Sequence, residues 1–103
     1  MKYDLPFDMT QGTVSSVELR WTIDAVNDLR ALDREISDRI TRKVTWFVSQ
    51  THPLRHAEPL SGIYAGVYRF RIGDYRVLFE IEATGQIHIL IVLRVKHRRE
   101  VYR

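Results

Sequence analysis

One stretch near the C-terminus constrains the fold of this chain more than any other. Over residues 67–81 arginines sit at alternate positions of a mainly apolar segment, and Gly73-Asp74 interrupts the pattern once. Alternation with a period of two is typical of a half-buried β-strand. Glycine at the first position of a two-residue loop favours a type II′ turn. The sequence therefore predicts a β-hairpin, with strands at 67–72 and 75–82.

The turn also determines which residues of the hairpin lie opposite one another. Three cross-strand pairs are expected: Ile72 with Tyr75, Arg71 with Arg76, and Arg69 with Leu78. Because cross-strand partners share a face, one face of the hairpin is apolar and suited to packing against helices. The other face carries Arg69, Arg71 and Arg76, with Glu80 farther along.

This arginine face is a candidate anion site. Directly opposed like charges destabilise a hairpin by on the order of a few tenths of a kcal/mol, so an anionic ligand would explain why they are kept. Residues 69–103 hold 8 Lys/Arg against 4 Asp/Glu, whereas residues 1–68 hold 8 against 9. A basic excess confined to one third of the chain favours a polyanion such as nucleic acid. A solvated basic face without a ligand is the alternative interpretation.

The segment before the hairpin predicts a strand followed by two antiparallel helices. Residues 17–21 alternate as a strand does, and Thr22 or Asp24 offers the N-cap of a first helix. Asp33 offers the N-cap of a second helix. The apolar residues of that second helix recur at helical spacing: Ile36, Ile40, Val44, Phe47 and Val48.

The rest of the chain completes one α+β domain. Residues 51–62 contain two prolines and are expected to form a loop, and the apolar run 87–95 predicts a central strand covered on both faces. Residues 1–15 show no clear period and are expected to be a flexible N-terminal extension, so that 16–103 form a single domain. The expected fold is an N-terminal strand, a two-helix hairpin, and a three-stranded antiparallel meander that completes a four-stranded sheet.

Composition excludes several kinds of site. The chain has no cysteine, so neither a disulfide nor a thiolate metal site is possible. Its four histidines show no metal-ligand spacing, and we expect neither a metal nor another cofactor. No span approaches the ~20 apolar residues of a membrane helix, and the first 16 residues lack a signal-peptide pattern. We therefore expect a soluble, cytoplasmic protein without membrane contact.

Three segments resemble one toxin family. They are Leu60-Ser-Gly62, the hairpin of residues 67–81, and Val95-Lys-His-Arg-Arg-Glu-Val-Tyr102, whose last six residues are the most specific. Over residues 17–103 the chain resembles the RelE branch of the RelE/ParE toxin superfamily. The resemblance implies a RelE-like fold and the toxin of a type II toxin–antitoxin system. It further implies a ribosome-dependent endoribonuclease that cleaves mRNA in the A site. A co-expressed RelB-like antitoxin would hold the toxin inactive in a hetero-oligomer.

The resemblance also implies which residues carry the activity. The catalytic candidates lie in the hairpin and the tail: Arg69, Arg71, Arg76, His97, Arg98 and Tyr102. The substrate's 2′-hydroxyl would attack the adjacent phosphorus, giving a 2′,3′-cyclic phosphate and a free 5′-hydroxyl without a metal. Arginines facing that phosphate would stabilise the charge of the transition state. Tyr102 would stack on a base, and His97 and Arg98 would lie near the reacting phosphate.

Proton transfer has more than one candidate. Arginine is a poor proton shuttle because its pKa exceeds ~12. His97 is the preferred carrier, since an imidazole titrates near ~6.5, although a plain phosphate contact fits it equally well. His52 and Glu58, in the loop before the hairpin, are second candidates. His88 lies within the central strand and is expected to be structural.

Two other functions fit the same fold. The ParE branch poisons DNA gyrase and cleaves nothing, which would make the chain a protein-binding inhibitor. A RelE-like domain whose activity has decayed is the other. The tail ending in Tyr102, together with three strand arginines on one face, favours the ribonuclease.

Overall fold

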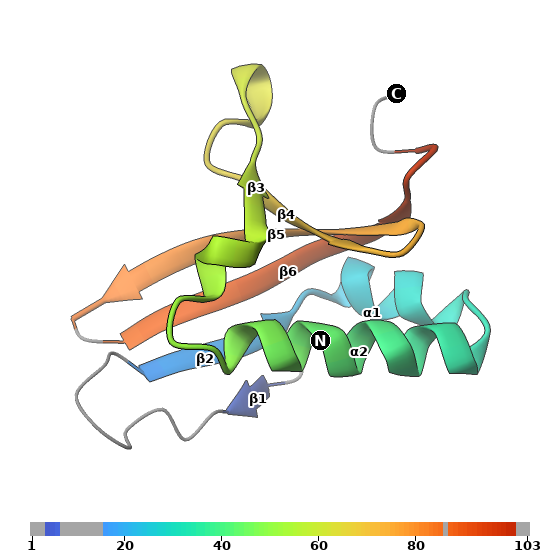
Figure 1. The fold of residues 1–103 in the computed structure, drawn as a ribbon, viewed down its shortest axis with the longest axis horizontal. Coiled ribbons are helices and arrows are strands. Elements are labelled where there is room, and N and C mark those ends of the chain that lie inside the picture. The colour runs from blue at the N-terminus through green and yellow to red at the C-terminus, as the bar shows by residue number, and fades with distance from the viewer. Residues whose placement is uncertain (1–3, 7–15, 86, 101–103) are drawn as a thin grey trace.

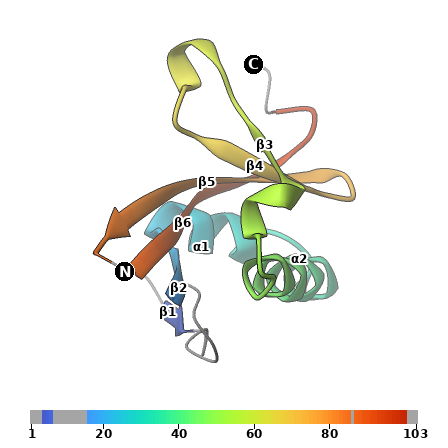
Figure 2. The same ribbon diagram turned by 60° about the vertical axis from the view of Figure 1, so that its left-hand side comes forward.

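Two helices pack on one face of a six-stranded sheet (Figure 1). The structure is a computed structural model that describes residues 4–6, 16–85 and 87–100. The strand order is β1-β2-β6-β5-β4-β3, and β2 and β6 are parallel whereas the other neighbouring strands are antiparallel. Both α-helices lie on the same side of the sheet in two views (Figures 1 and 2). We call the other side the open face. The expected α+β class is confirmed, with two more strands than expected.

The first strand of the expected domain leads directly into the helices. β2 spans Ser16–Trp21, α1 spans Ile23–Arg30 and α2 spans Arg34–Val48. Thr22, rather than Asp24, caps α1: its Oγ1 accepts a hydrogen bond of 3.1 Å from the amide of Ala25. This bond satisfies one of the amides that a helix start leaves without a partner.

The predicted hairpin is confirmed in its turn and its cross-strand pairs, with small differences in the strand ends. β4 spans Tyr68–Ile72 and β5 spans Tyr75–Thr84, and all three expected cross-strand pairs are present. Gly73 has a φ of 58° whereas Asp74 stays at negative φ, as a type II′ turn requires. A side chain at position 73 would be strained there, which explains the glycine.

β6, Ile87–His97, is the central strand, but only one of its faces is fully covered. Leu90, Val92 and Val95 are buried against the helical layer, whereas Ile89 and Ile91 on the open face are only half-buried. The prediction of a strand covered on both faces is wrong in that respect, because both α-helices lie on one side. The register of β5 against β6 shifts at Leu78/Phe79: Leu78 pairs with Arg94 and Phe79 with Val92, which leaves Leu93 as an extra residue.

Two short edge strands were not expected. β1 spans Asp4–Pro6 and pairs with β2, and β3 spans Ala57–Pro59 and pairs with β4. The predicted loop is therefore wrong for residues 57–59, and Asp4–Pro6 of the expected extension form a strand; the rest of 1–15 lies outside the described residues. Three residues are too few to show a period, and each strand ends in a proline, which sheets tolerate at their edges. Two 3₁₀ turns flank β3: Pro53–His56 before it and Gly62–Tyr64 after it.

The core lies between the helices and the apolar face of the hairpin. Phe47 of α2 stacks on Phe70 of β4 at a centroid distance of 4.5 Å, and Phe70 stacks on Phe79 of β5 at 4.4 Å. The predicted stripe of the second helix supplies Ile40, Val44, Phe47 and Val48 to this core, all buried. Each such side chain contributes about 1.5–3 kcal/mol on burial, so the core fixes which hairpin face is left for charged residues.

Candidate functional site

A row of three cations crosses the open face at one end of the sheet. Arg71 of β4 lies opposite Arg76 of β5, and Arg76 lies opposite Lys96 of β6. The neighbouring residues Val77 and Val95 are buried on the helical side. Since strand residues alternate between faces, Arg71, Arg76 and Lys96 belong to the open face, and we call them the basic row.

Arg76 is the anchored member of the row. The residue is only 7% exposed, and its Nη1 donates hydrogen bonds to the carbonyl oxygens of Gly73, at 3.0 Å, and Tyr75, at 2.9 Å. The guanidinium is thus turned onto the backbone of the hairpin turn, while the side chain of Arg71 is 62% exposed. This difference explains how two directly opposed arginines coexist.

A carboxylate lies beside the arginines. Glu58 of β3 pairs with Arg69 across the strands, and Arg69 Nε donates to Glu58 Oε1 at 2.8 Å. Arg71 Nη1 lies 3.9 Å from Glu58 Oε2. The hydrogen bond from Arg69 lowers the pKa of Glu58 below its ordinary value; partial desolvation opposes this, and the charges of Arg69, Arg71 and Arg76 add to it. Glu58 is therefore ionised at neutral pH, and its side chain is still 43% exposed.

Arg98, directly after β6, contacts the hairpin turn. The backbone amide of Arg98 donates to the carbonyl oxygen of Asp74 at 2.7 Å, and Arg98 Nε lies 3.7 Å from Asp74 Oδ1. Residues 98–100 and the arm formed by β3 and β4 both rise on the open face (Figure 1). The structure therefore brings Arg98 to the end of the sheet where the basic row lies. Tyr102 lies outside the described residues.

His97 is placed on the other face of the sheet. It pairs with Tyr75, and the two rings meet edge to face with centroids 5.4 Å apart. Its Nδ1 accepts a hydrogen bond of 3.2 Å from the amide of Arg99. The extra residue Leu93 is the reason: without it, alternation along β6 would assign His97 to the open face and Lys96 to the helical side. The sequence therefore missed Lys96.

Arg94, whose face the sequence left open, lies opposite Leu78 and so shares the alternation of Lys96, but its guanidinium binds a carboxylate of α1. Its Nε and Nη2 donate to the two carboxylate oxygens of Asp28 on α1, at 2.8 and 2.9 Å, and Asp28 also accepts from the amide of Val95 at 2.8 Å. Burial opposes the charge of Asp28, but the hydrogen bonds from Arg94 and Val95 outweigh it and lower the pKa of Asp28. The charge of Arg94 is thus matched inside the fold.

The remaining candidates lie elsewhere. His52 is exposed before the first 3₁₀ turn, and His88 pairs with Ala83 toward the opposite end of β6 from His97. Within residues 4–6, 16–85 and 87–100, no three His, Asp or Glu side chains gather as a metal site would need. No helix in the described part of the chain is both long and apolar enough to cross a membrane.

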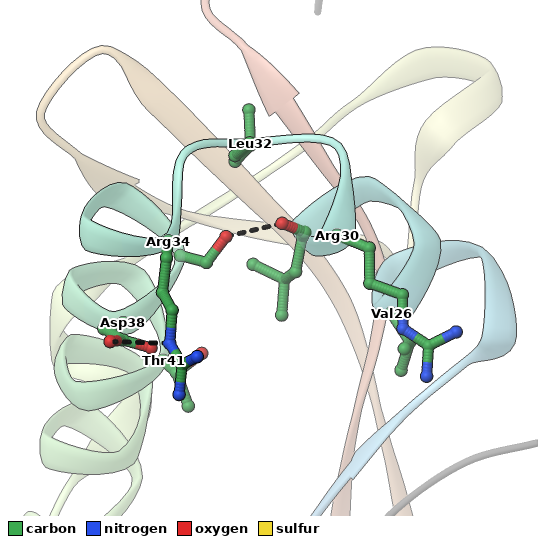
Figure 3. Close-up of a pocket in the computed structure, with 8 residues that line it drawn as sticks. Val26, Arg30, Leu32, Arg34, Asp38 and Thr41 are labelled. Atoms are coloured by element: carbon green, nitrogen blue, oxygen red, sulfur yellow. Dashed lines mark hydrogen bonds and ion pairs between the residues drawn. The ribbon is translucent and has the colours of Figure 1, made fainter.

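A groove lies between α1 and α2 (Figure 3). Its volume is about 480 Å³, and three of its eight lining residues are aliphatic (Val26, Leu29 and Leu32) whereas five are polar or charged: Arg30, Arg34, Ser37, Asp38 and Thr41. Ser37 Oγ donates to the carbonyl oxygen of Leu29, and Arg34 Nε lies 3.9 Å from a carboxylate oxygen of Asp38. Ser37 and Asp38 therefore already have partners within the helical layer, and the groove lies on the side of the sheet away from the basic row.

Comparison with known proteins identifies the family. A family profile described as ParE toxin of type II toxin-antitoxin system, parDE, matches residues 19–102. Toxin RelG of Mycobacterium tuberculosis (strain ATCC 25618 / H37Rv) is 33% identical over 85 residues, which is 82% of this chain and 94% of RelG.

Solved structures agree with that assignment. A chain of the toxin–antitoxin complex RelBE2 from Mycobacterium tuberculosis superposes with a TM-score of 0.69 at 31% identity, over 84% of this chain and 100% of its own length. A chain of the RelB–RelE antitoxin–toxin complex from Methanococcus jannaschii does so with a TM-score of 0.54 at 27% identity, over 80% and 93% respectively. This chain therefore belongs to the RelE/ParE superfamily of type II toxin–antitoxin toxins.

Proposed function

We propose that this toxin is a ribosome-dependent endoribonuclease that cleaves mRNA in the A site, by attack of the substrate's 2′-hydroxyl on the adjacent phosphorus. The observation that carries the proposal is the basic row on the open face, with the carboxylate of Glu58 beside it. Cleavage by ribose cyclisation needs a group to accept the hydroxyl proton and cations to stabilise the charge that develops on the phosphate. Both are present on one face of the sheet.

Each arginine near the open face has a different role in this proposal. Arg71, the most exposed of the three strand arginines, is the direct contact to the reacting phosphate. Arg76 stabilises the phosphate through its charge and not by direct contact, because its guanidinium is bonded to the carbonyls of the turn. Arg69 orients Glu58, and Arg98 extends the phosphate contacts at the turn. Tyr102 keeps the role of stacking on a base of the codon.

We favour Glu58 over His97 as the general base. Its lowered pKa keeps it ionised at neutral pH, which is the state that can accept a proton. The same shift makes it a weaker base, so its contribution depends on being positioned by Arg69. His97 shares the helical side with Tyr75 and would have to leave that contact to reach the phosphate.

A RelB-like antitoxin is the proposed partner. The similar chain in the M. tuberculosis structure is part of a toxin–antitoxin complex, as is the one from M. jannaschii. We propose that such an antitoxin binds this toxin in a hetero-oligomer in the cytoplasm and holds it inactive until the antitoxin is lost.

Cleavage of translated mRNA tests the function. The purified full chain is added to translating ribosomes, and the 5′ ends of a reporter message are mapped with and without translation. We expect cuts inside codons on translated message only, and a loss of about 10²-fold for Arg71→Ala with an unchanged melting temperature. Arg34→Ala on α2, where the side chain is 93% exposed, is the matched control for loss of a charge. A message that stays intact refutes the proposal.

Inhibition of DNA gyrase is the second candidate function. The name of the matching family profile, ParE, favours it. A supercoiling assay with purified gyrase distinguishes the two: inhibited supercoiling together with intact message would replace the ribonuclease by a gyrase inhibitor.

A further inference from the structure

Lys96 occupies a distinctive place in the basic row. It follows the buried Val95 in β6 and lies directly opposite Arg76, which in turn lies opposite Arg71. The side chain of Lys96 is half-buried. Lys96 lies opposite Arg76 of β5, and its charge also contributes to the lowered pKa of Asp28 on α1.

Neutralising Asp28 does not account for Lys96. The two carboxylate oxygens of Asp28 already accept from Arg94 Nε and Nη2, and one of them also accepts from the amide of Val95. Arg94 therefore matches the charge of Asp28. Lys96 adds a further positive charge to a row that already contains two arginines, which is unfavourable unless an anion binds there.

The order of the strands separates Lys96 from Glu58 across the open face. Glu58 is on β3, the arginines are on β4 and β5, and Lys96 is on β6. Glu58 is level with Arg94, two residues before Lys96, so three strand spacings of roughly 4.8 Å and a two-residue offset of roughly 6.6 Å put the two backbones about 16 Å apart, before their side chains lean inward. A phosphate held by the arginines would thus have the carboxylate on one side and the ammonium on the other.

We propose that Lys96 is the general acid of the cleavage and protonates the 5′-oxygen as it leaves, which rests on the proposed ribonuclease function. In-line displacement needs the base and the acid on opposite sides of the phosphorus, and that is how the strand order places Glu58 and Lys96. An ammonium can give up a proton, whereas a guanidinium retains its own because its pKa exceeds ~12.

The step balances without a co-reactant. The 2′-hydroxyl transfers its proton to the carboxylate of Glu58, and the 2′-oxygen forms a bond to phosphorus. The bond between phosphorus and the 5′-oxygen breaks, and that oxygen takes a proton from the Lys96 ammonium. The products are a 2′,3′-cyclic phosphate and a 5′-hydroxyl, and exchange with water returns the proton from Glu58 to Lys96.

A leaving-group substitution tests this role. Single-turnover cleavage is measured on ribosomes programmed with a synthetic mRNA whose cleaved linkage carries either the natural 5′-oxygen or a 5′-sulfur. A thiolate leaves without protonation, so a defect in the general acid disappears with sulfur. Lys96→Met removes the acid and the charge, whereas Lys96→Arg removes the acid and keeps the charge. Lys43→Met, on α2, is the matched lysine control.

We expect both Lys96 variants to lose about 10²-fold or more on the oxygen substrate and to come within a few-fold of the wild type on the sulfur substrate. Lys43→Met should cleave both as the wild type does. Full activity of Lys96→Arg would reduce Lys96 to a phosphate contact, and a loss that sulfur does not rescue would make it structural; either result overturns the proposal. A wild-type protein that cleaves neither substrate would instead refute the ribonuclease function itself.

Discussion

Asp28 holds the last strand to the helical layer, and replacing it measures how strongly. Asp28 accepts three hydrogen bonds, two from the guanidinium of Arg94 and one from the amide of Val95, at 2.8–2.9 Å. β2 ends opposite Val92, so the amide of Val95 has a helix side chain as its partner instead of a strand. Removing Asp28 therefore leaves a guanidinium and an amide without their acceptor.

The size of the effect follows from exposure. Breaking a fully buried ion pair costs about 3–5 kcal/mol, but Arg94 is 40% exposed and can turn to water, whereas Asp28 is 17% exposed. We expect Asp28→Ala to cost about 3 kcal/mol. Asp28→Asn should cost about 2 kcal/mol, because its amide oxygen can still accept from Val95, a bond that contributes about 1 kcal/mol. At about 4–8 °C per kcal/mol, the alanine variant melts roughly 12–24 °C lower.

The stability that Asp28 contributes should depend on pH, and it should fall in acid. The pKa of Asp28 in the folded protein is lowered from an ordinary value of 3.8, so its contribution is fully present above that value and is lost as pH falls through the folded pKa. The stability difference between wild type and Asp28→Asn should be constant near neutral pH and shrink below about pH 4. Urea unfolding at several pH values measures it. A difference under about 0.5 kcal/mol at neutral pH, or one that does not shrink in acid, would refute the reasoning.

Two further substitutions test the open face. Glu58→Gln removes the proposed base and the partner of Arg69. We expect the rate of single-turnover cleavage to fall by about 10²-fold or more, while RNA binding, measured by filter retention, is kept or strengthened. An unchanged cleavage rate would remove Glu58 from the mechanism. Arg76→Ala removes both hydrogen bonds to the turn, at Gly73 and Tyr75, and should lower the free energy of unfolding, measured by thermal unfolding, by about 1–2 kcal/mol. The control Arg34→Ala should leave it unchanged. Equal stability of the two variants would show that Arg76 does not stabilise the turn.

The hairpin could be predicted because two local signals agree. Alternation assigns residues to faces, and the Gly73-Asp74 turn sets the register, so the arrangement of the three strand arginines follows without knowledge of the rest of the fold. What alternation cannot supply is how far each side chain reaches. Arg71 and Arg76 are both arginines and are assigned to the same face, yet Arg71 is exposed whereas Arg76 is buried against the carbonyls of the turn.

The edge strands and the position of Glu58 could not be predicted from the sequence, for a different reason. β1 and β3 are each three residues long and end in proline, so neither local period nor propensity marks them as strands. Only pairing with β4 brings Glu58 onto the open face, where Arg69 and Arg71 contact it. A carboxylate in an apparent loop is a weak candidate from sequence, and the same carboxylate across from an arginine on a sheet is a strong one.

One extra residue decides which basic group of the tail joins the site. Leu93 is inserted into β6 where Leu78 pairs with Arg94 and Phe79 with Val92. Thr22 holds this point from the start of α1, since its amide donates to the carbonyl oxygen of Val92 at 3.0 Å and its hydroxyl donates to that of Leu93 at 2.9 Å. From Leu93 onward the faces of β6 are exchanged, so Lys96 rather than His97 completes the row with Arg71 and Arg76. The cap that begins the first helix thus also secures the register of the proposed general acid, at the opposite end of the chain.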